Sequence, residues 1–362
     1  MRVVLAGGGT TGHISPMLAT AEALRTMDPD GTLTCVGTPV GLETDLVPSA
    51  GFTLKTIDPV PLPRGFSPKL FTLPVRLGKA VGQARAILTE AHPDVVVGFG
   101  GYASLPVFLA ARWLKIPVVV HEGNAVPGLA NRIASRFAKE VLVTFPDTGL
   151  PREIVIGMPV RSAISSMERD SLRPTALEFF ELEPDARVVL VSGGSQGAKR
   201  LNDAIWNAAH EITAAGVSIL HITGRKNFLD FPNLEMPPEN YARVPYVEHM
   251  EQAYAAADLM VARSGAGTVT ETAIIGLPAI FVPLPHGNGE QAKNAASVVA
   301  AGAGILIDDA DLTGERLAKE VVRLFSDQTT LTQMGQAGQH LMPRNSAQIL
   351  ASRVLVAGRS HP

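Results

Sequence analysis

The residues best suited to chemistry lie where short apolar runs break into glycine-containing loops. One such loop, Arg263-Ser264-Gly265-Ala266-Gly267-Thr268-Val269-Thr270-Glu271, follows the apolar run 259–262 and leads into a segment with helical spacing. The first N–H groups of a helix have no intrahelical partner and lie at the positive end of its dipole, so a helix start can bind an anion. Glu271, about one turn inside the helix, could accept hydrogen bonds from sugar hydroxyls beside that anion. The stretch therefore predicts a nucleotide site.

The first glycine loop, Gly7-Gly8-Gly9-Thr10-Thr11-Gly12-His13, fits G-x-G-x-x-G directly after the first apolar run. A nicotinamide enzyme would place an acidic residue at the end of the next strand to hold the ribose, but residues 35–38 read Cys-Val-Gly-Thr. A turn needed only for tight geometry would explain the glycines and leave His13 unexplained. Because a histidine at the mouth of such a loop can titrate near neutrality, we expect His13 to move a proton.

The second glycine loop, 192–199, follows the apolar run 188–191. It nearly matches a P-loop, but Ala198 stands where the glycine before Lys199 is required, which argues against ATP hydrolysis. It also fits the G-x-S-x-G of a nucleophile elbow, and Asp258 and His286 follow in the order of a serine hydrolase. The oxyanion segment H-G-G-G is absent from the sequence. The simpler interpretation is phosphate binding through Ser195 and the loop amides.

Two further segments place polar side chains beside apolar runs. Gln291 and Asn294 are three residues apart, on one face of a predicted helix, where they could bind sugar hydroxyls. An exposed polar helix start explains that spacing equally well. In the first half, His121-Glu122-Gly123-Asn124 ends an apolar run, so a titratable pair and an amide should emerge at the edge of the sheet, although chance placement in a loop is an equal alternative.

Two D-x-D patterns, at 28–30 and 309–311, could hold a metal with a sugar nucleotide, but each lies where a turn is expected. We therefore predict no metal and no cofactor. The single cysteine, Cys35, excludes an intramolecular disulfide and is expected to be a small buried hydrophobe.

The segment 59–89 carries five basic residues and no acidic residue, interleaved with apolar side chains. Apolar groups among cations suit the interface of an anionic membrane. The alternative is a helix that packs its apolar face on the sheet and leaves its cations solvated, and composition alone slightly favours that alternative.

The elements that must position these residues alternate regularly. Apolar runs on consecutive positions, such as Val95-Val96-Val97 and Val118-Val119-Val120, are typical of parallel strands covered on both faces. The runs predict two doubly wound α/β units separated near 157–160, and a last helix at about 345–357 that could pack on either unit. The expected strands are 2–6, 32–37, 53–57, 94–98, 117–121 and 141–144, then 187–192, 217–222, 258–262, 279–283 and 304–307.

Length and charge agree with this organisation. A chain of 362 residues suggests two domains, and a net charge of -3 argues against a nucleic-acid partner. Only four apolar residues precede Gly7, too few for a signal peptide, and no apolar run approaches the ~20 residues that span a bilayer. We therefore expect a cytoplasmic protein with its chemistry in a cleft between the two units, at the carboxyl ends of the strands.

With these motifs in view, the chain resembles the bacterial MurG family, the UDP-N-acetylglucosamine transferases acting on undecaprenyl-pyrophosphoryl-N-acetylmuramoyl-pentapeptide. The matching motifs are Gly7-Gly8-Gly9-Thr10-Thr11-Gly12-His13, Gly98-Phe99-Gly100-Gly101-Tyr102, His121-Glu122-Gly123-Asn124, Gly157-Met158-Pro159-Val160-Arg161, Gly193-Gly194-Ser195-Gln196-Gly197, Arg263-Ser264-Gly265-Ala266, and Gly289-Glu290-Gln291 with Asn294. The resemblance implies a GT-B fold with domains 1–160 and 161–344, the helix in 345–362 returning to the first domain. It also implies an inverting, metal-independent transfer in peptidoglycan synthesis.

The resemblance also implies site residues and partners. Its donor contacts fall on Thr10, Thr11, Gly12, Asn124, Arg161, Ser195, the backbone of Val247, Ala266, Gly267, Thr268, Val269, Thr270, Glu271 and Gln291, to which the spacing adds Asn294. We expect His13 to be the base, with Glu122 as its competitor. A lipid-linked acceptor makes membrane docking the favoured interpretation of 59–89, as a peripheral protein on the cytoplasmic face of the cell membrane. Another UDP-sugar GT-B enzyme, such as a glycolipid synthase or an epimerase, and a serine hydrolase remain as alternatives.

Overall fold

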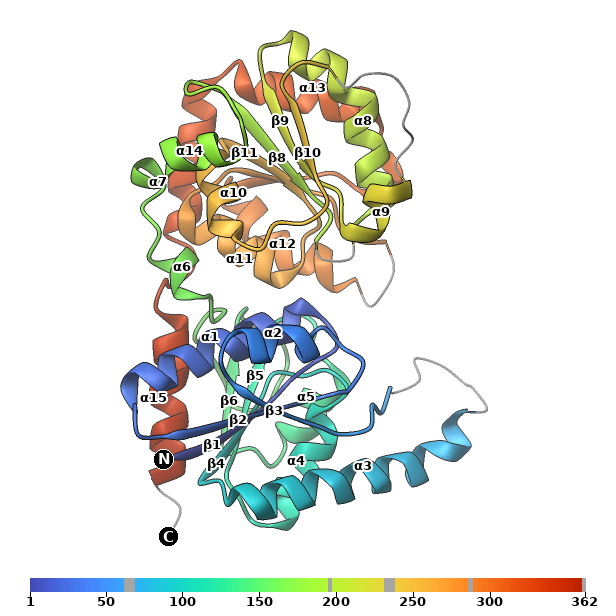
Figure 1. The fold of residues 1–362 in the computed structure, drawn as a ribbon, viewed down its shortest axis with the longest axis vertical. Helices are drawn as coiled ribbons and strands as arrows, with labels where there is room; N and C mark the ends of the chain where they lie inside the picture. Colours follow the sequence, from blue (N-terminus) through green and yellow to red (C-terminus); the bar gives the residue numbers. More distant parts are fainter. Residues whose placement is uncertain (62–68, 195–196, 231–237, 286–288, 360–362) are drawn as a thin grey trace. The chain divides into compact units, whose positions relative to one another are not determined.

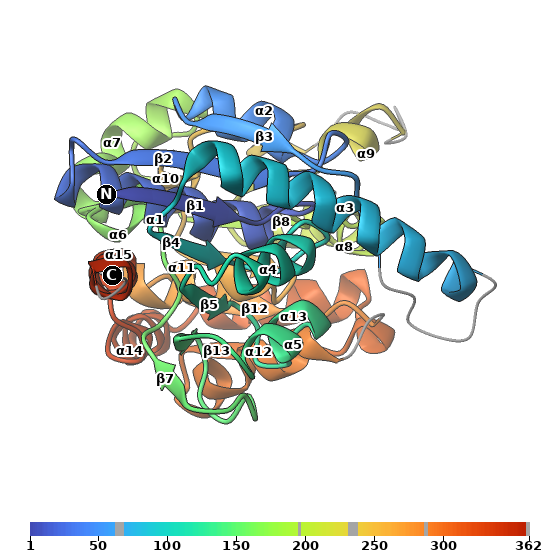
Figure 2. The same ribbon diagram turned by 90° about the horizontal axis from the view of Figure 1, so that it is seen from below.

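The computed structural model describes residues 1–61, 69–194, 197–230, 238–285 and 289–359. They form two compact units (Figures 1 and 2). Unit 1 comprises Met1–Arg161 and Asn345–Pro362, and unit 2 comprises Ser162–Arg344. Each unit is a parallel sheet with helices on both faces, the architecture that consecutive apolar strand positions require.

The sheet of unit 1 has seven strands in the order β3-β2-β1-β4-β5-β6-β7, and all pairs are parallel. Stepping outward from β1 in both directions gives the doubly wound topology, in which loops from neighbouring strands meet at the carboxyl edge. The strands are β1 Arg2–Ala6, β2 Thr32–Gly37, β3 Thr53–Thr56, β4 Val95–Gly98, β5 Val118–Glu122, β6 Glu140–Val143 and β7 Glu153–Val155.

Two apolar layers cover the sheet of unit 1. One face packs on α1 and on the last helix, which lie side by side, and the other face packs on α3 and α4 (Figure 1). Cys35 is buried, as predicted, and burial raises the pKa of its thiol to about 12. The helices are α1 Thr11–Met27, α2 Glu43–Ser49, α3 Lys69–Ala91, α4 Ser104–Trp113, α5 Leu129–Ala134 and α15 Ser346–Arg359.

Unit 2 repeats the plan with six parallel strands in the order β10-β9-β8-β11-β12-β13. Its strands are β8 Val188–Ser192, β9 Ser218–Ile222, β10 Tyr241–Val244, β11 Leu259–Ala262, β12 Ala279–Phe281 and β13 Gly304–Leu306. Its helices are α6 Ser162–Ser165, α7 Arg169–Phe179, α8 Lys199–Ala214, α9 Arg225–Asp230, α10 Met250–Ala256, α11 Ala266–Ile275, α12 Glu290–Ala300, α13 Gly314–Phe325, α14 Gln328–Gln339 and the 3-10 turn η1 Asp309–Asp311.

The predicted pair of doubly wound units is confirmed, and the eleven expected strands are present to within about two residues at each end. Strands β7 and β10 were missed. Both are short edge strands that alternate or mix polar with apolar residues, so neither gives the continuous apolar run of a central strand. Within the described residues, no helix is both long and apolar enough to cross a membrane.

Candidate functional site

In unit 1, His13 lies in the first turn of α1, beside the loop that follows β4. Its Nδ1 is 2.8 Å from the carbonyl oxygen of Phe99. A carbonyl oxygen only accepts, so Nδ1 carries the hydrogen and the neutral ring keeps its lone pair on Nε2. The partly exposed ring is therefore held in the tautomer that can remove a proton at Nε2.

Close backbone packing brings the β1 and β4 loops together. Gly101 has φ +83°, and a Cβ there would lie 2.3 Å from the carbonyl oxygen of Gly8. Only glycine permits both this conformation and this approach. The hydroxyl of Ser104, at the start of α4, lies 2.9 Å from the Ala6 oxygen and 2.6 Å from the Gly100 oxygen, so it joins the same two loops.

The first glycine loop rests on a buried carboxylate that sequence reasoning missed. Glu43 Oε2 accepts the N–H of Gly9 at 2.9 Å, and Oε1 accepts the N–H and hydroxyl of Thr38 at 2.8 and 2.7 Å. Burial raises the pKa of the Glu43 carboxyl, but the bonds from Gly9, from its own backbone and from Thr38 outweigh burial and lower that pKa. The sequence offered a clue to this residue. No acidic residue occurs at the end of the second strand, but Glu43 follows six residues after Gly37.

Glu122 is also a structural carboxylate. It is 2% exposed and accepts three N–H bonds of 2.9 Å, from the backbones of Asn124 and Gly128 and from Nδ2 of Asn131. These bonds fix the loop that follows β5. Both carboxylate oxygens of Glu122 are therefore engaged within its own unit.

The expectation that His121 and Glu122 emerge together at the sheet edge is wrong. His121 is 1% exposed, and its Nε2 donates to the carbonyl oxygen of Gly157 at 3.2 Å. Burial lowers the pKa of His121 to about 4, so the ring stays neutral at physiological pH. Asn131, which also donates to the His121 carbonyl at 3.1 Å, was not singled out in the sequence.

The remaining expected residues of unit 1 reach its surface. Thr10 is the N-cap of α1, makes no side-chain cap bond, and accepts the first helical bonds from His13 and Ile14. The N–H groups of Thr11 and Gly12 precede those bonds and therefore have no intrahelical acceptor. This helix start therefore has the geometry that we expect of an anion-binding site. Thr10 and Gly12 are exposed, and Thr11, Asn124 and Arg161 are partly exposed.

In unit 2, the start of α11 has a similar arrangement of N–H groups. The first helical bond runs from the N–H of Val269 to the Gly265 oxygen at 3.0 Å. The N–H groups of Ala266, Gly267 and Thr268 come before it and have no acceptor within the helix. A Cβ added to Gly265 or Gly267 would meet nothing within 4 Å, so space is open beside these amides.

Glu271 lies four residues after Gly267 on α11. This spacing places both residues on the same side of the helix. Its Oε2 accepts a 2.6 Å hydrogen bond from the hydroxyl of Tyr254, a residue that the sequence did not mark. Val269 and Thr270, between them, are fully buried. The helix turns these two side chains into the core, so a donor contact at either position would have to be made by the backbone.

Gln291 and Asn294 do not share one exposed face as expected. Asn294 is fully buried, and its Nδ2 donates to the Ser264 carbonyl at 3.3 Å, so it supports the α11 loop from beneath. Gln291 is partly exposed and accepts the N–H of Leu284 at 2.9 Å. The side chain of Val247, after β10, is buried, and Ser195 lies outside the described residues.

The D-x-D sequence 309–311 forms a single 3-10 turn, as expected. Asp309 is nearly buried and pairs with Nη1 of Arg263 at 2.5 Å and with Nη1 of Arg200 at 3.6 Å. These ion pairs tie the residue before the α11 loop to the start of α8. Across the described ranges, no three acidic, histidine or cysteine side chains gather as metal ligands.

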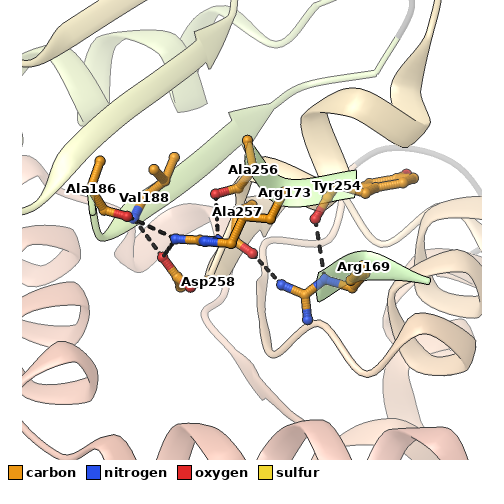
Figure 3. Close-up of polar contacts among 8 residues, drawn as sticks. All are labelled: Arg169, Arg173, Ala186, Val188, Tyr254, Ala256, Ala257 and Asp258. Carbon is orange, nitrogen blue, oxygen red and sulfur yellow. Dashed lines mark hydrogen bonds and ion pairs between the residues drawn. The ribbon is translucent and has the colours of Figure 1, made fainter. Parts of the chain in front are cut away.

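The hydrolase alternative fails on the position of Asp258. This residue precedes β11, at the amino edge of the sheet, where its Oδ2 accepts from Nη2 of Arg173 at 2.9 Å and from the N–H of Val188 at 2.8 Å (Figure 3). The loop that begins at Gly193 follows the carboxyl end of β8. In a parallel sheet these edges are opposite, so Asp258 cannot orient a histidine at that loop.

Comparison with protein families gives two matches. The description "Glycosyltransferase family 28 N-terminal domain" matches residues 3–143, and "Glycosyltransferase family 28 C-terminal domain" matches residues 188–349. The first match lies within unit 1, and the second covers most of unit 2 and extends into the start of α15.

Two relatives carry the name UDP-N-acetylglucosamine--N-acetylmuramyl-(pentapeptide) pyrophosphoryl-undecaprenol N-acetylglucosamine transferase. The relative from Nocardioides sp. is 51% identical over 99% of this chain and 98% of its own. The relative from Mycolicibacterium smegmatis is 53% identical over 92% of this chain and 88% of its own. Such identity extends from end to end, well beyond the glycine loops.

Among solved structures, MurG of Acinetobacter baumannii is 31% identical, with a TM-score of 0.74 over 98% of this chain and 99% of that one. The UDP-GlcNAc 2-epimerase of Neisseria meningitidis, solved with UDP-GlcNAc, has a TM-score of 0.70 over 98% of this chain and 100% of that one, at 15% identity. The second similarity concerns the fold alone.

Proposed function

The chain belongs to glycosyltransferase family 28, and on that premise we propose that it transfers N-acetylglucosamine from UDP-N-acetylglucosamine to the 4-hydroxyl of the muramoyl sugar in undecaprenyl-pyrophosphate-linked muramoyl-pentapeptide. This is the step from lipid I to lipid II in peptidoglycan synthesis. The observation that carries the proposal is the end-to-end identity with transferases of that name. The starts of α1 and α11, whose first N–H groups could bind the diphosphate of the donor, support it.

The proposed reaction is a single displacement that inverts the anomeric carbon. His13 Nε2 removes the proton of the acceptor hydroxyl while the hydroxyl oxygen attacks the sugar, and the bond to the diphosphate of UDP breaks. Negative charge grows on the diphosphate as that bond breaks. The N–H groups of Ala266, Gly267 and Thr268 are preorganised donors that would stabilise it.

The tautomer of His13 supports its role as base. The Phe99 carbonyl holds the hydrogen on Nδ1, so Nε2 is ready to accept without a change of tautomer. Glu122, in contrast, is buried among three N–H donors. We therefore assign proton removal to His13, and to Glu122 the positioning of the loop after β5.

The test is a product assay with radiolabelled UDP-N-acetylglucosamine and a short-chain lipid acceptor. His13→Ala should lower kcat by roughly 10²- to 10⁴-fold, the usual contribution of a general base. His210→Ala, an exposed histidine on α8, is the matched control and should keep normal turnover. Near-normal kcat in His13→Ala at saturating substrates would remove His13 from the role. An epimerase would convert the sugar nucleotide without acceptor, and this product distinguishes the alternative.

We also propose that α3 docks unit 1 on the cytoplasmic face of the cell membrane. The helix buries Ala84 and Leu88 in the apolar layer over the sheet, and Ala80 is also buried, which is the packing face that the composition suggested. Its amino-terminal turns extend beyond the other helices of unit 1 (Figures 1 and 2). Val75, on these turns, is 77% exposed. The helix therefore combines a packed face with an exposed valine near its start, while residues 62–68 lie outside the described residues.

A neighbouring aromatic residue extends this surface. Trp113, at the end of α4, is 66% exposed, and the guanidinium of Arg85 lies 4.9 Å from its ring centroid. An indole beside a cation suits the boundary between headgroups and acyl chains. Trp113 was not part of the sequence prediction, because it comes 24 residues after the segment 59–89.

Sedimentation with vesicles of phosphatidylglycerol tests the docking surface. Val75→Ser combined with Arg85→Glu should lower binding by roughly tenfold or more, because each basic residue near an anionic surface contributes about 1 kcal/mol and the glutamate is repelled. Val356→Ser, an exposed valine on α15, is the control and should bind normally. Unchanged vesicle binding by the double variant would contradict the proposal that α3 docks on the membrane.

A further inference from the structure

The strongest unassigned feature of unit 2 is the contact between Tyr254 and Glu271. Tyr254 lies on α10 and is buried, and its hydroxyl is 2.6 Å from Oε2 of Glu271 on α11. An ionised carboxylate only accepts, so the phenol donates its hydrogen. The distance lies in the range of charge-assisted O–H···O⁻ bonds, which are stronger than neutral ones.

A partly buried guanidinium holds the backbone of the two helices that carry this pair. Arg169, at the start of α7, donates from Nε to the Tyr254 carbonyl at 3.3 Å and from Nη2 to the Ala257 carbonyl (Figure 3). Its Nη1 lies 3.4 Å from the carbonyl of Gly276, the left-handed residue that ends α11. One side chain therefore joins the ends of the two helices that carry Tyr254 and Glu271.

Arg173, one turn later on α7, connects the end of α10 to the sheet. It donates to the carbonyl of Ala256 at 2.8 Å and pairs with Asp258, which also accepts the first N–H of β8 (Figure 3). The helix α10 is thus fixed at its end by two cations, and its tyrosine has little freedom to shift. A rigid donor holds its acceptor in one orientation.

We propose that Tyr254 is a positioning residue, whose hydroxyl holds the Glu271 carboxylate in the orientation that accepts hydrogen bonds from the ribose hydroxyls of a uridine diphosphate. This inference rests on the donor site proposed above. A glutamate has three rotatable side-chain bonds, and ordering them on ligand binding costs free energy. The hydrogen bond from Tyr254 orders the carboxylate when the protein folds, so less side-chain entropy is lost when the nucleotide binds.

Calorimetric titration of the full chain with UDP and with 2′,3′-dideoxy-UDP tests the inference. Tyr254→Phe keeps the ring and removes the hydroxyl, and it should weaken UDP binding roughly 3- to 10-fold, the cost of ordering one side chain. Binding of dideoxy-UDP, which has no ribose hydroxyls, should not change. In turnover, KM for the sugar nucleotide should rise by the same factor while kcat stays within about twofold.

Tyr241→Phe is the matched control. Tyr241 is the other buried tyrosine of unit 2 with a bonded hydroxyl, which lies 2.6 Å from Nδ1 of His221. This variant also loses a buried hydroxyl bond, but it should leave both dissociation constants unchanged.

Three results would overturn the inference, and they are distinguishable. Unchanged UDP binding by Tyr254→Phe would show that the hydroxyl does not matter for the ligand. Equal weakening of UDP and dideoxy-UDP would show that the variant acts through the fold and not through the ribose. A wild-type chain that binds neither nucleotide would overturn the donor assignment itself, and this inference with it.

Discussion

Unit 2 should lose stability between pH 7 and pH 5 because of His221. The ring is fully buried, with Nε2 3.0 Å from Oδ1 of Asn202 and Nδ1 2.6 Å from the Tyr241 hydroxyl. The amide oxygen only accepts, so Nε2 carries the hydrogen and Nδ1 accepts from the tyrosine. Burial, with a smaller effect from Arg243, lowers the pKa of His221 from 6.5 to about 3.

The sign and size of the effect follow from proton linkage. Above pH 6.5 the ring is neutral in both the folded and the unfolded chain, so it contributes no pH dependence. Below that value the unfolded chain binds a proton that the folded chain does not bind, so stability falls as the pH falls. From pH 7 to pH 5 the free energy of unfolding of unit 2 should decrease by about 2 kcal/mol.

The titration of carboxylates does not mask the stability change expected between pH 7 and pH 5. The fold lowers the pKa of Glu43 from 4.5 and those of Asp58, Asp94 and Asp327 from 3.8. A group with a lowered carboxyl pKa adds stability that is complete above its unfolded value and is lost only as the pH falls further. Their contributions therefore change mainly below pH 4.5.

A tryptophan reports on unit 2 alone. The chain has two tryptophans, and Trp206 packs edge-on against Tyr241 with 5.7 Å between ring centroids. In a Trp113→Phe background, urea unfolding followed by fluorescence should show the loss of about 2 kcal/mol between pH 7 and pH 5. His221→Asn should be less stable at both pH values, yet its loss over this interval should be smaller by the same amount. An undiminished loss in His221→Asn would refute the reasoning.

Three substitutions test other contacts of the site. Glu43→Gln replaces the charged acceptor of the first glycine loop, and its free energy of unfolding should drop by about 1–3 kcal/mol in urea unfolding; an unchanged midpoint would contradict this role. Gly101→Ala places a Cβ against the Gly8 oxygen at φ +83°, so calorimetry should show a fall of several degrees in Tm, and an unaltered Tm would count against the close approach. Asp309→Asn leaves a nearly buried arginine without its anion and should cost about 3–5 kcal/mol, whereas Asp311→Asn, in an exposed pair, should cost less than about 1 kcal/mol; equal effects would discount the buried pair.

The fold was readable from the sequence because central parallel strands are covered on both faces and must be apolar at consecutive positions. Val95–Gly98 is a strand of this kind and is entirely buried. The edge strand Glu153–Val155 is partly exposed, so it does not need the run of consecutive apolar residues by which a central strand is recognised. Local pattern therefore identifies the middle of each sheet better than its margins.

The glycine loops were predictable for a similar local reason, while the side chains that support them were not. Glu43 contacts Gly9 across 34 positions of the sequence, and Tyr254 contacts Glu271 across 17. No periodicity relates such residues, because the contact exists only after the sheets have formed. Helical spacing placed Gln291 and Asn294 on one helix face, but it could not say that Asn294 is fully buried, since the sequence does not show how deeply α12 packs into the core.

The return of the last helix to unit 1 has a consequence for the order of folding. The apolar side chains of Leu350 and Val354 complete the layer that α1 forms on one face of the first sheet. During synthesis these residues follow the whole of unit 2, so the apolar layer of unit 1 stays incomplete until α15 has been made. Unit 2 is continuous in sequence and needs no later segment. The second half of the chain can therefore reach its native state before the first half does.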